Sequence, residues 1–260
     1  MLETIKTLAR RAGEIILHAE QEKLQVQNKS GAADFVTAYD VAVQTFLMRE
    51  LSACFPEAQF LCEEKENDAL TAAPTFVIDP IDGTTNFIRG LRHSCVSIGY
   101  YEGGEVQLGV IYNPYSDEMF FATRGGGAFL THGGVTRPVK REDKPLAKSL
   151  VVVGTSPYDK EKEGEETMRI LRELLYSSLD LRRSGSAAMD LAYVADGRYD
   201  LFFEAVISPW DFGAGRLLVT EAGGVITCPN GEEMPMRRVP VLAGAPSAHR
   251  EFQERIGYHG

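Results

Sequence analysis

The sequence has no run of apolar residues long enough to cross a membrane. A transmembrane helix needs about 20 consecutive apolar residues, and the 260-residue chain contains no such run. The first residues, MLETIKTLARRAGEIILHAE, carry acidic side chains at amphipathic spacing. They lack the apolar block and the cleavage site of a secretory signal. We therefore expect a cytoplasmic protein without a membrane partner.

Metal-type cysteine spacing and long basic blocks are also missing. The four cysteines, Cys54, Cys62, Cys95 and Cys228, show no CxxC pattern, so reduced thiols are expected rather than a cysteine metal site. The net charge is −10 and no segment concentrates lysine or arginine, which argues against nucleic-acid binding through surface charge. An anionic substrate would need a local positive charge, and a bound metal cation can supply one.

The composition that remains is globular, with 44% hydrophobic residues and enough apolar material for a sizeable core. Helical spacing of apolar residues predicts one helix near residues 2–16 and another at about 37–54, with a loop, NKSGAADFVT, between them. The strand patterns that follow are AQFLCEE, TFVIDPID, CVSIGYY, EVQLGVIYNP and EMFFATRGGGAFL, with a hairpin at Gly103-Gly104.

The second half of the sequence alternates between strand and helix patterns. A charged, proline-containing stretch at 136–148 separates the halves, so we divide the chain into an N-terminal part, 1–140, and a C-terminal part, 141–260. The strands expected after it are SLVVVGT, LDLRRSG, YDLFFEA, GGVIT and VPVLAGA, with helices at about 159–178, 187–195, 211–221 and the end of the chain. Such alternation is typical of α/β layers.

The stretch VIDPIDGTTNF, residues 77–87, places two carboxylates after an apolar strand. Pro80 cannot donate to a strand ladder, so we expect the strand to leave the sheet there, at the kind of edge where open α/β sheets carry their sites. Asp79 and Asp82 would repel each other at this spacing unless a cation lay between them. Gly83 and the threonines after it offer backbone amides and hydroxyls to an anion.

Other acids occupy comparable places. Glu63-Glu64 end an earlier strand, Asp211 follows the single tryptophan at a helix start, and Asp40 lies in DFVTAYD. Oxygen ligands without His or Cys favour a hard cation, usually Mg²⁺ where phosphate is the substrate. Each acid alone has a simpler explanation as a helix N-cap, a solvated strand end or a turn residue. For all of these acids to occur together with the turn at Gly83, the simpler explanations would require several coincidences.

Two motifs carry a family resemblance. DPIDGTTNF and WDFGAGRLLVTEAGG resemble the signature motifs of the inositol monophosphatase family, a group of Mg²⁺-dependent, lithium-sensitive phosphatases. The resemblance covers nearly the whole chain. It implies an α/β fold of the inositol monophosphatase and fructose-1,6-bisphosphatase type, a layered αβαβα sandwich with a mostly antiparallel sheet first and a mixed sheet second. It also implies one compact unit with the active site between the two parts, and a possible homodimer.

The resemblance assigns roles to individual residues. The attacking water would be oriented by Thr84 and Asp40. Two or three Mg²⁺ ions would be held by Glu63, Asp79, the backbone carbonyl of Ile81, Asp82 and Asp211. The phosphate and the hydroxyls of the substrate would be contacted by Gly83, Thr84, Thr85, Gly185, Ser186, Ala187 and Glu204, with Lys29 near the metals.

The predicted activity is Mg²⁺-dependent hydrolysis of a small phosphate ester, inositol monophosphate or a related sugar or polyol phosphate. Three positions depart from the family pattern. Cys62 stands where a glycine is common, and we interpret it as a small buried side chain rather than a redox group. Ser208 and Pro209 stand where inositol phosphatases often carry histidine and a small residue, which suggests a broader substrate range.

Other activities remain open. A fructose-1,6-bisphosphatase or another sugar phosphatase could share this scaffold. A 3′(2′),5′-bisphosphate nucleotidase fits less well, because GTTNF lacks the lysine that such enzymes more often carry after the first threonine. The alternative outside enzymes is a catalytically silent binding or regulatory relative. Against it, the predicted metal ligands and the Thr84–Asp40 pair are all present.

Overall fold

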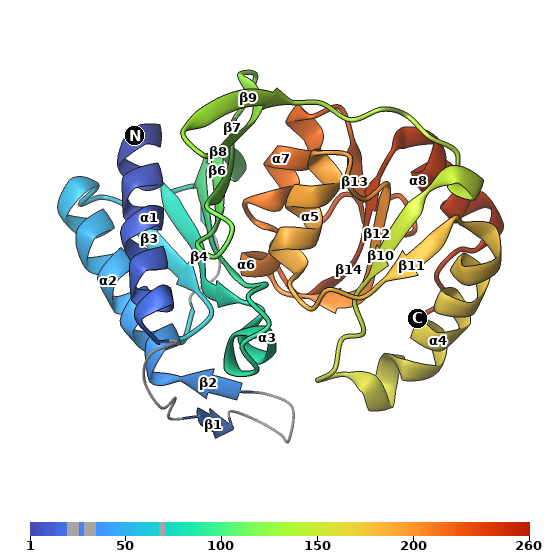
Figure 1. Cartoon of the computed structure of the whole chain (residues 1–260), viewed down its shortest axis with the longest axis horizontal. Coiled ribbons are helices and arrows are strands. Elements are labelled where there is room, and N and C mark those ends of the chain that lie inside the picture. The colour runs from blue at the N-terminus through green and yellow to red at the C-terminus, as the bar shows by residue number, and fades with distance from the viewer. Residues whose placement is uncertain (20–25, 29–34, 68–70) are drawn as a thin grey trace.

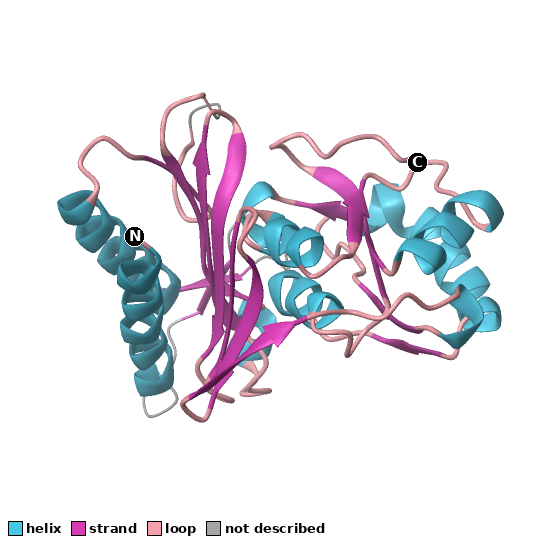
Figure 2. Cartoon of the chain, turned by 90° about the horizontal axis from the view of Figure 1, so that it is seen from above, coloured by secondary structure: helices cyan, strands magenta, loops and turns pink. Residues whose placement is uncertain are grey.

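The computed structural model describes residues 1–19, 26–28, 35–67 and 71–260. Helices and sheets alternate in five layers, helix, sheet, helix, sheet and helix, as Figure 2 shows. The layered αβαβα fold expected from the sequence is therefore confirmed. No helix among the described residues combines the length and apolar character that a membrane crossing requires.

The N-terminal part is built on a seven-stranded sheet (Figure 1). Helices α1 (Leu2–Ala19) and α2 (Ala38–Cys54) cover its outer face. Only β3 and β4 pair in parallel, and every other pair in the sheet is antiparallel. In spatial order the strands are β3 (Gln59–Cys62), β4 (Thr75–Asp82), β5 (Cys95–Glu102), β6 (Glu105–Asn113), β7 (Glu118–Thr123), β8 (Gly127–His132) and β9 (Val135–Val139).

The C-terminal part carries a mixed five-stranded sheet. Here β10 pairs in parallel with β11 and β12, and β14 pairs antiparallel with β12 and β13. In spatial order the strands are β11 (Asp180–Arg182), β10 (Leu150–Val153), β12 (Leu201–Ile207), β14 (Val239–Gly244) and β13 (Val225–Thr227). The outer helices are α4 (Lys160–Ser177) and α8 (Pro246–Arg255), and the helices between the two sheets are α5 (Ala187–Ala195), α6 (Pro209–Phe212) and α7 (Gly215–Glu221).

Three short elements complete the chain. Strands β1 (Val26–Asn28) and β2 (Phe35–Thr37) form a two-stranded ribbon. Helix α3 (Thr84–Ile88) follows β4, and a 3₁₀ turn (Leu146–Lys148) precedes β10.

Glycines set the spacing between the first sheet and the middle helices. A Cβ on Gly109 of β6 would lie 2.6 Å from the carbonyl oxygen of Ala214, and one on Gly99 of β5 would lie 3.0 Å from the carbonyl carbon of Gly213. Both separations are below normal contact distance, so the sheet and the α6–α7 connection meet backbone to backbone. This contact fixes where α6, with Asp211, sits relative to β4.

The structure corrects four sequence-based details. Residues 35–37, expected in a loop, form β2. Residues 135–139 form β9, where a connecting stretch was expected, and an edge strand tolerates its Pro138. The helix expected at 211–221 is divided into α6 and α7. The strand does not leave the sheet at Pro80. Pairing with β5 is irregular between Asp79 and Asp82 and then resumes, because a bulge accommodates a residue without an N–H.

Candidate active site

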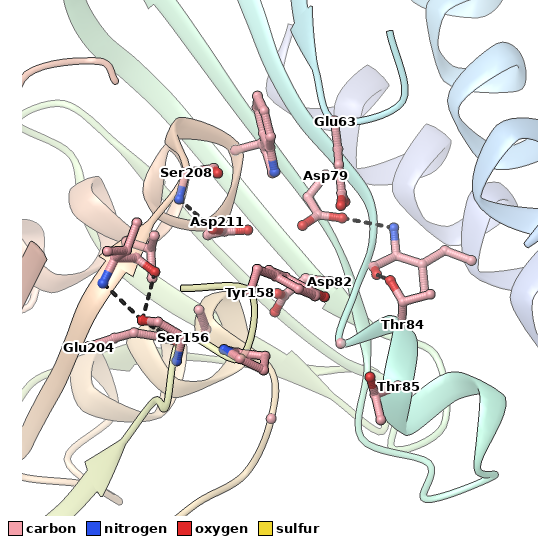
Figure 3. A pocket seen from close by; sticks show the side chains of 18 of the residues that line it. Glu63, Asp79, Asp82, Thr84, Thr85, Ser156, Tyr158, Glu204, Ser208 and Asp211 are labelled. Atoms are coloured by element: carbon pink, nitrogen blue, oxygen red, sulfur yellow. Dashed lines mark hydrogen bonds between the residues drawn. The ribbon is translucent and has the colours of Figure 1, made fainter. Parts of the chain in front are cut away.

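A cavity of about 360 Å³ is lined by residues from both parts of the chain. The ends of β3 and β4 and the start of α3 line it from the N-terminal part, and residues within 156–158, 183–187 and 204–211 line it from the C-terminal part. In Figure 3, Glu63, Asp79 and Thr84 lie on one side, and Asp211, Glu204 and Ser156 lie on the other. The two parts of the chain therefore share one site.

Three aspartates converge in this cavity. One carboxylate oxygen each from Asp79, Asp82 and Asp211 lies within 4.8 Å of the other two. The backbone N–H of Ile81 donates to Asp79 at 3.0 Å, and the N–H of Ser208 donates to Asp211 at 2.6 Å. Glu63 lines the same cavity. The predicted acids at the end of β3, in β4 and in α6 are thus brought together, although about 130 residues of the sequence separate Asp82 from Asp211.

The electrostatics of the trio fit a cation. Burial raises the pKa of Asp79 well above its usual range, and repulsion from Glu63, Asp82 and Asp211 adds to this. Burial also raises the pKa of Asp211, with Asp82 and Glu63 contributing. Such a set of buried carboxylates is unfavourable when charged unless a positive ion neutralises it. An oxygen-only donor set matches Mg²⁺.

Asp82 is anchored from the C-terminal part. Its Oδ2 accepts hydrogen bonds from the hydroxyl of Ser186 and, at 2.9 Å, from the N–H of Ala188. Burial raises the pKa of Asp82 to about 6, while these two hydrogen bonds act in the opposite direction. Ser186 was predicted to contact substrate, and the structure places its hydroxyl on the carboxylate of Asp82. Gly185 and Ala187 line the cavity.

Thr84 and Asp40 meet beside the trio. The hydroxyl of Thr84 lies 3.5 Å from Oδ1 of Asp40 and 3.3 Å from the carbonyl oxygen of Ile81. Oδ2 of Asp40 accepts from the N–H and the hydroxyl of Thr37, which forms a capping box at the start of α2. The cap holds the Asp40 carboxylate against Thr84.

Two glycines bring α3 against the loop before α5. Gly83 has a φ of +88° and Gly185 a φ of +93°, a conformation that favours glycine. A Cβ on Gly83 would lie 3.1 Å from the carbonyl oxygen of Gly185. The side chain of Asn86 donates to the carbonyl of Ser184 at 2.9 Å. Gly83, Thr84 and Thr85 all line the cavity, and their contact with a phosphate stays a prediction. The sequence analysis did not single out Asn86.

Segment 154–158, Gly-Thr-Ser-Pro-Tyr, was missed by the sequence analysis. Ser156 has a φ of +39° and its N–H donates to Oε1 of Glu204 at 2.9 Å. Its hydroxyl accepts from the N–H of Val206 at 2.9 Å. Burial raises the pKa of Glu204 to about 7. The sequence did contain one sign of this segment, a cluster of Gly, Ser and Pro directly after an apolar strand pattern. Asp79 and Asp82 were found from a similar position after an apolar strand pattern.

Replacing Gly154 with alanine should destabilise the protein. The new Cβ would overlap the carboxylate of Glu204, and overpacking of this kind costs about 1–3 kcal/mol. We expect the melting temperature to fall by roughly 2–10 °C in differential scanning calorimetry. Gly164→Ala in α4 is the matched control, because no atom lies within 4 Å of its added Cβ and alanine favours a helix. A fall of equal size in both variants would contradict the proposed overlap.

Three remaining predictions concern residues around the site. Lys29 lies outside the described residues. Cys62 is buried, and burial raises the pKa of its thiol to about 12, which agrees with a packed side chain. Ser208 lines the cavity and caps α6. Arg183 also lines the cavity, and the sequence analysis did not single it out.

The comparisons with known proteins agree with this geometry. The model of the "Inositol monophosphatase family" matches residues 1–257. Inositol monophosphatase 2 of Solanum lycopersicum is 42% identical over 251 residues, covering 93% of this chain and 91% of the relative. The extragenic suppressor protein SuhB of Bartonella henselae is 33% identical, with a TM-score of 0.90 over 97% of this chain and 96% of its own.

A further solved relative has been seen with ligands. Inositol monophosphatase II of Staphylococcus aureus, with inositol monophosphate bound, is 26% identical, with a TM-score of 0.82 over 98% of this chain and 92% of its own. The same protein has also been solved with 2′-AMP bound. With a family match over almost the full length and an acidic cluster in the cavity, the chain belongs to the inositol monophosphatase family and is a phosphomonoesterase of that type.

Proposed function

We propose that the protein hydrolyses inositol monophosphate or a related sugar or polyol phosphate in a Mg²⁺-dependent reaction. The observation that carries the proposal is the convergence of Asp79, Asp82 and Asp211 within 4.8 Å, directly beside the Thr84–Asp40 pair. The names of the relatives support the substrate class. The cytoplasmic location, the homodimer and the absence of a nucleic-acid partner stay predictions.

The donor set would hold two or three Mg²⁺ ions through the three aspartates, Glu63 and the carbonyl of Ile81. When bound, the ions would neutralise charge on the phosphate and lower the pKa of the attacking water. Asp79, whose pKa is raised by the neighbouring charges of Glu63, Asp82 and Asp211 as well as by burial, would be one of the residues that hold the ions. Lys29, by the family resemblance, would lie near these ions.

The chain itself would position the reactants. Asp40 orients the hydroxyl of Thr84, which accepts a hydrogen bond from the attacking water and passes its proton toward Asp40. The N–H groups of Gly83, Thr84 and Thr85 face the phosphate oxygens. Water oxygen bonds to phosphorus while the ester P–O bond breaks, and the alcohol leaves with a proton from solvent. Catalysis of this kind depends mainly on positioning and charge.

The alcohol would lie toward the C-terminal part. Glu204 is held by Ser156 with one oxygen occupied, so the other oxygen can accept from a substrate hydroxyl. Gly185, Ser186 and Ala187 form the neighbouring wall and the support of Asp82. A carboxylate and a set of backbone groups suit a polyhydroxylated alcohol better than an apolar one.

Phosphate release from inositol 1-phosphate tests the proposal directly. We expect release that requires Mg²⁺ and is suppressed by millimolar Li⁺. Release from sugar phosphates alone would preserve the chemistry and change the substrate. If no phosphate ester is hydrolysed with Mg²⁺ present, the silent-relative alternative is correct and the proposal fails.

A broader substrate range is the second candidate, and Ser208 favours it. Its side chain stands in the cavity wall, where it leaves more room and fewer fixed contacts than an imidazole. We expect comparable kcat/KM values for inositol 1-phosphate, fructose 1,6-bisphosphate and glycerol 2-phosphate. A preference for inositol 1-phosphate of about a hundredfold, roughly 3 kcal/mol, would exclude this broader range.

A further inference from the structure

Glu63 lies outside the regular part of the first sheet, unlike Asp79 and Asp82 of β4. It follows β3, an edge strand of the seven-stranded sheet, and the chain turns at this point. Its N–H still donates to the carbonyl oxygen of Ile78 in β4 at 3.3 Å. The open side of an edge strand has no neighbouring strand to pair its backbone groups. Other groups must therefore hold the backbone on that side of Glu63.

On the C-terminal side of Glu63, the carboxamide of Gln44 binds both backbone groups of Glu64. The Nε2 group of Gln44 donates to the carbonyl oxygen of Glu64 at 2.9 Å, and the N–H of Glu64 donates to Oε1 of Gln44 at 2.9 Å. Gln44 is only 6% exposed, and leaving a buried partner of such a bond unpaired would cost free energy. The side chain thus takes the place of a neighbouring strand.

On the N-terminal side of Glu63, Asn67 binds Cys62 in the same way. The N–H of Cys62 donates to Oδ1 of Asn67 at 2.8 Å, and Nδ2 of Asn67 donates to the carbonyl oxygen of Cys62 at 2.6 Å. Nδ2 also donates to the carbonyl oxygen of Lys65 at 3.1 Å, which closes the turn after Glu63. A carboxamide is suited to this because it offers a donor and an acceptor together. Each neighbour of Glu63 is therefore held at both of its backbone groups.

Gln44 also connects Glu63 to Asp40. Gln44 follows Asp40 by four residues on α2, which places both side chains on one face of the helix, and both are buried. One helix therefore sets the position of the Asp40 carboxylate and of the backbone beside Glu63. The side chain of Glu63 is directed toward Asp79 (Figure 3), and its charge contributes to the raised pKa of Asp79.

We propose that Gln44 and Asn67 are positioning residues for the metal site, which hold Glu63 in place through the backbone on either side of it. This inference rests on the proposed function and deepens it. Groups that orient a metal ligand typically contribute 10- to 100-fold to metal affinity. The residues that line the cavity include Glu63 but neither of these two amides, so their effect on the ion would be transmitted by Glu63.

Titration of metal-free protein with Mg²⁺ in an isothermal calorimeter tests the proposal without substrate. Gln44→Ala should raise the apparent Kd for Mg²⁺ by about 10- to 100-fold. Asn67→Ala, at an exposed position, should fold like wild type and raise the Kd by about tenfold. Gln253→Ala and Asn230→Ala are the matched controls, because each removes a side-chain bond to a backbone group, at 3.1 and 3.0 Å, away from the cavity. Both controls should bind Mg²⁺ like wild type.

Phosphate release from inositol 1-phosphate gives a second readout. At limiting Mg²⁺, Gln44→Ala and Asn67→Ala should both be slower than wild type. At saturating Mg²⁺, kcat and KM should return to within about threefold of the wild-type values, because the reacting groups are intact. If Gln44→Ala acted by displacing Asp40, kcat would stay low at every Mg²⁺ concentration, and the role in positioning Glu63 would be overturned.

A double-mutant cycle tests whether Gln44 acts through Glu63. In a Glu63→Gln background the ligand is already impaired, so adding Gln44→Ala should raise the Kd for Mg²⁺ by less than about threefold. A further loss as large as in wild type would overturn the proposal. Wild-type Mg²⁺ binding in Gln44→Ala or in Asn67→Ala would overturn the role of that residue and keep the proposed function. If wild type itself binds no Mg²⁺, the proposed function and the positioning role fail together.

Discussion

Asp79→Asn is expected to lower kcat/KM about a thousandfold and, without metal, to raise the melting temperature. Asp79 is buried among Glu63, Asp82 and Asp211, so a neutral side chain there removes repulsion from all three. The same change removes one of the carboxylates proposed to hold the ions. Metal ions contribute several kcal/mol to transition-state stabilisation, and a loss of about 4 kcal/mol corresponds to about a thousandfold.

The two readouts separate this explanation from general damage. A variant that merely unfolds loses activity and melting temperature together, whereas Asp79→Asn should lose activity and gain stability in EDTA. Mg²⁺ should then raise its melting temperature less than that of wild type. Asp180→Asn, an exposed aspartate outside the cavity, is the control and should match wild type in activity. An Asp79→Asn protein with wild-type rates would refute the metal role of Asp79.

Metal-free protein is expected to be more stable near pH 5 than near pH 8. The pKa of Asp82 is raised from 3.8 to about 6 and that of Glu204 from 4.5 to about 7. Between its unfolded and its native pKa, each carboxyl group has released its proton in the unfolded chain but still holds it in the native state. The free energy of unfolding therefore declines as the pH rises. Over its whole titration each group contributes a loss on the order of 3 kcal/mol. Part of this loss has occurred by about pH 5, and it is complete by about pH 8.

Mg²⁺ should reverse the trend. The ion binds the deprotonated carboxylates, so its stabilisation is larger at about pH 8 than at about pH 5. Thermal unfolding in EDTA and in millimolar Mg²⁺, recorded across this pH range, measures both effects. The expected pattern is a falling melting temperature with pH in EDTA and a flat or rising one in Mg²⁺. A melting temperature independent of Mg²⁺ at pH 8 would contradict a carboxylate site for the ion.

The sequence predicted the parts of the site that are local in the chain. Asp79, Asp82 and Gly83 follow one apolar strand within five residues, so their proximity needed no knowledge of the fold. Asp211 was found because its motif is local too. The meeting of Asp211 with Asp79 depends on how two sheets pack around the middle helices, and the family resemblance supplied that information.

The far wall of the cavity could not be predicted in the same way. The φ of Ser156 is set by hydrogen bonds to Glu204 and Val206, some 50 residues away, and no local pattern encodes them. In the sequence Arg183 looks like any exposed arginine, and only the fold places its guanidinium against Gly185 in the loop before α5. Strand β9 was missed because its exposed residues and Pro138 give the pattern of a linker, whereas the neighbouring strand β8 holds it at the sheet edge.

The backbone contact at Gly99 and Gly109 sets how closely the carboxylates of the site approach one another. Asp79 and Asp82 belong to one side of that contact and Asp211 to the other, so the approach of their oxygens to within 4.8 Å of one another depends on the distance between two layers. A methyl group on Gly109 would press against Ala214 and move α6, with Asp211, away from β4. The affinity for the metal would then fall as the spacing between the layers grows. A glycine that lines neither the metal site nor the substrate cavity would thus control that affinity.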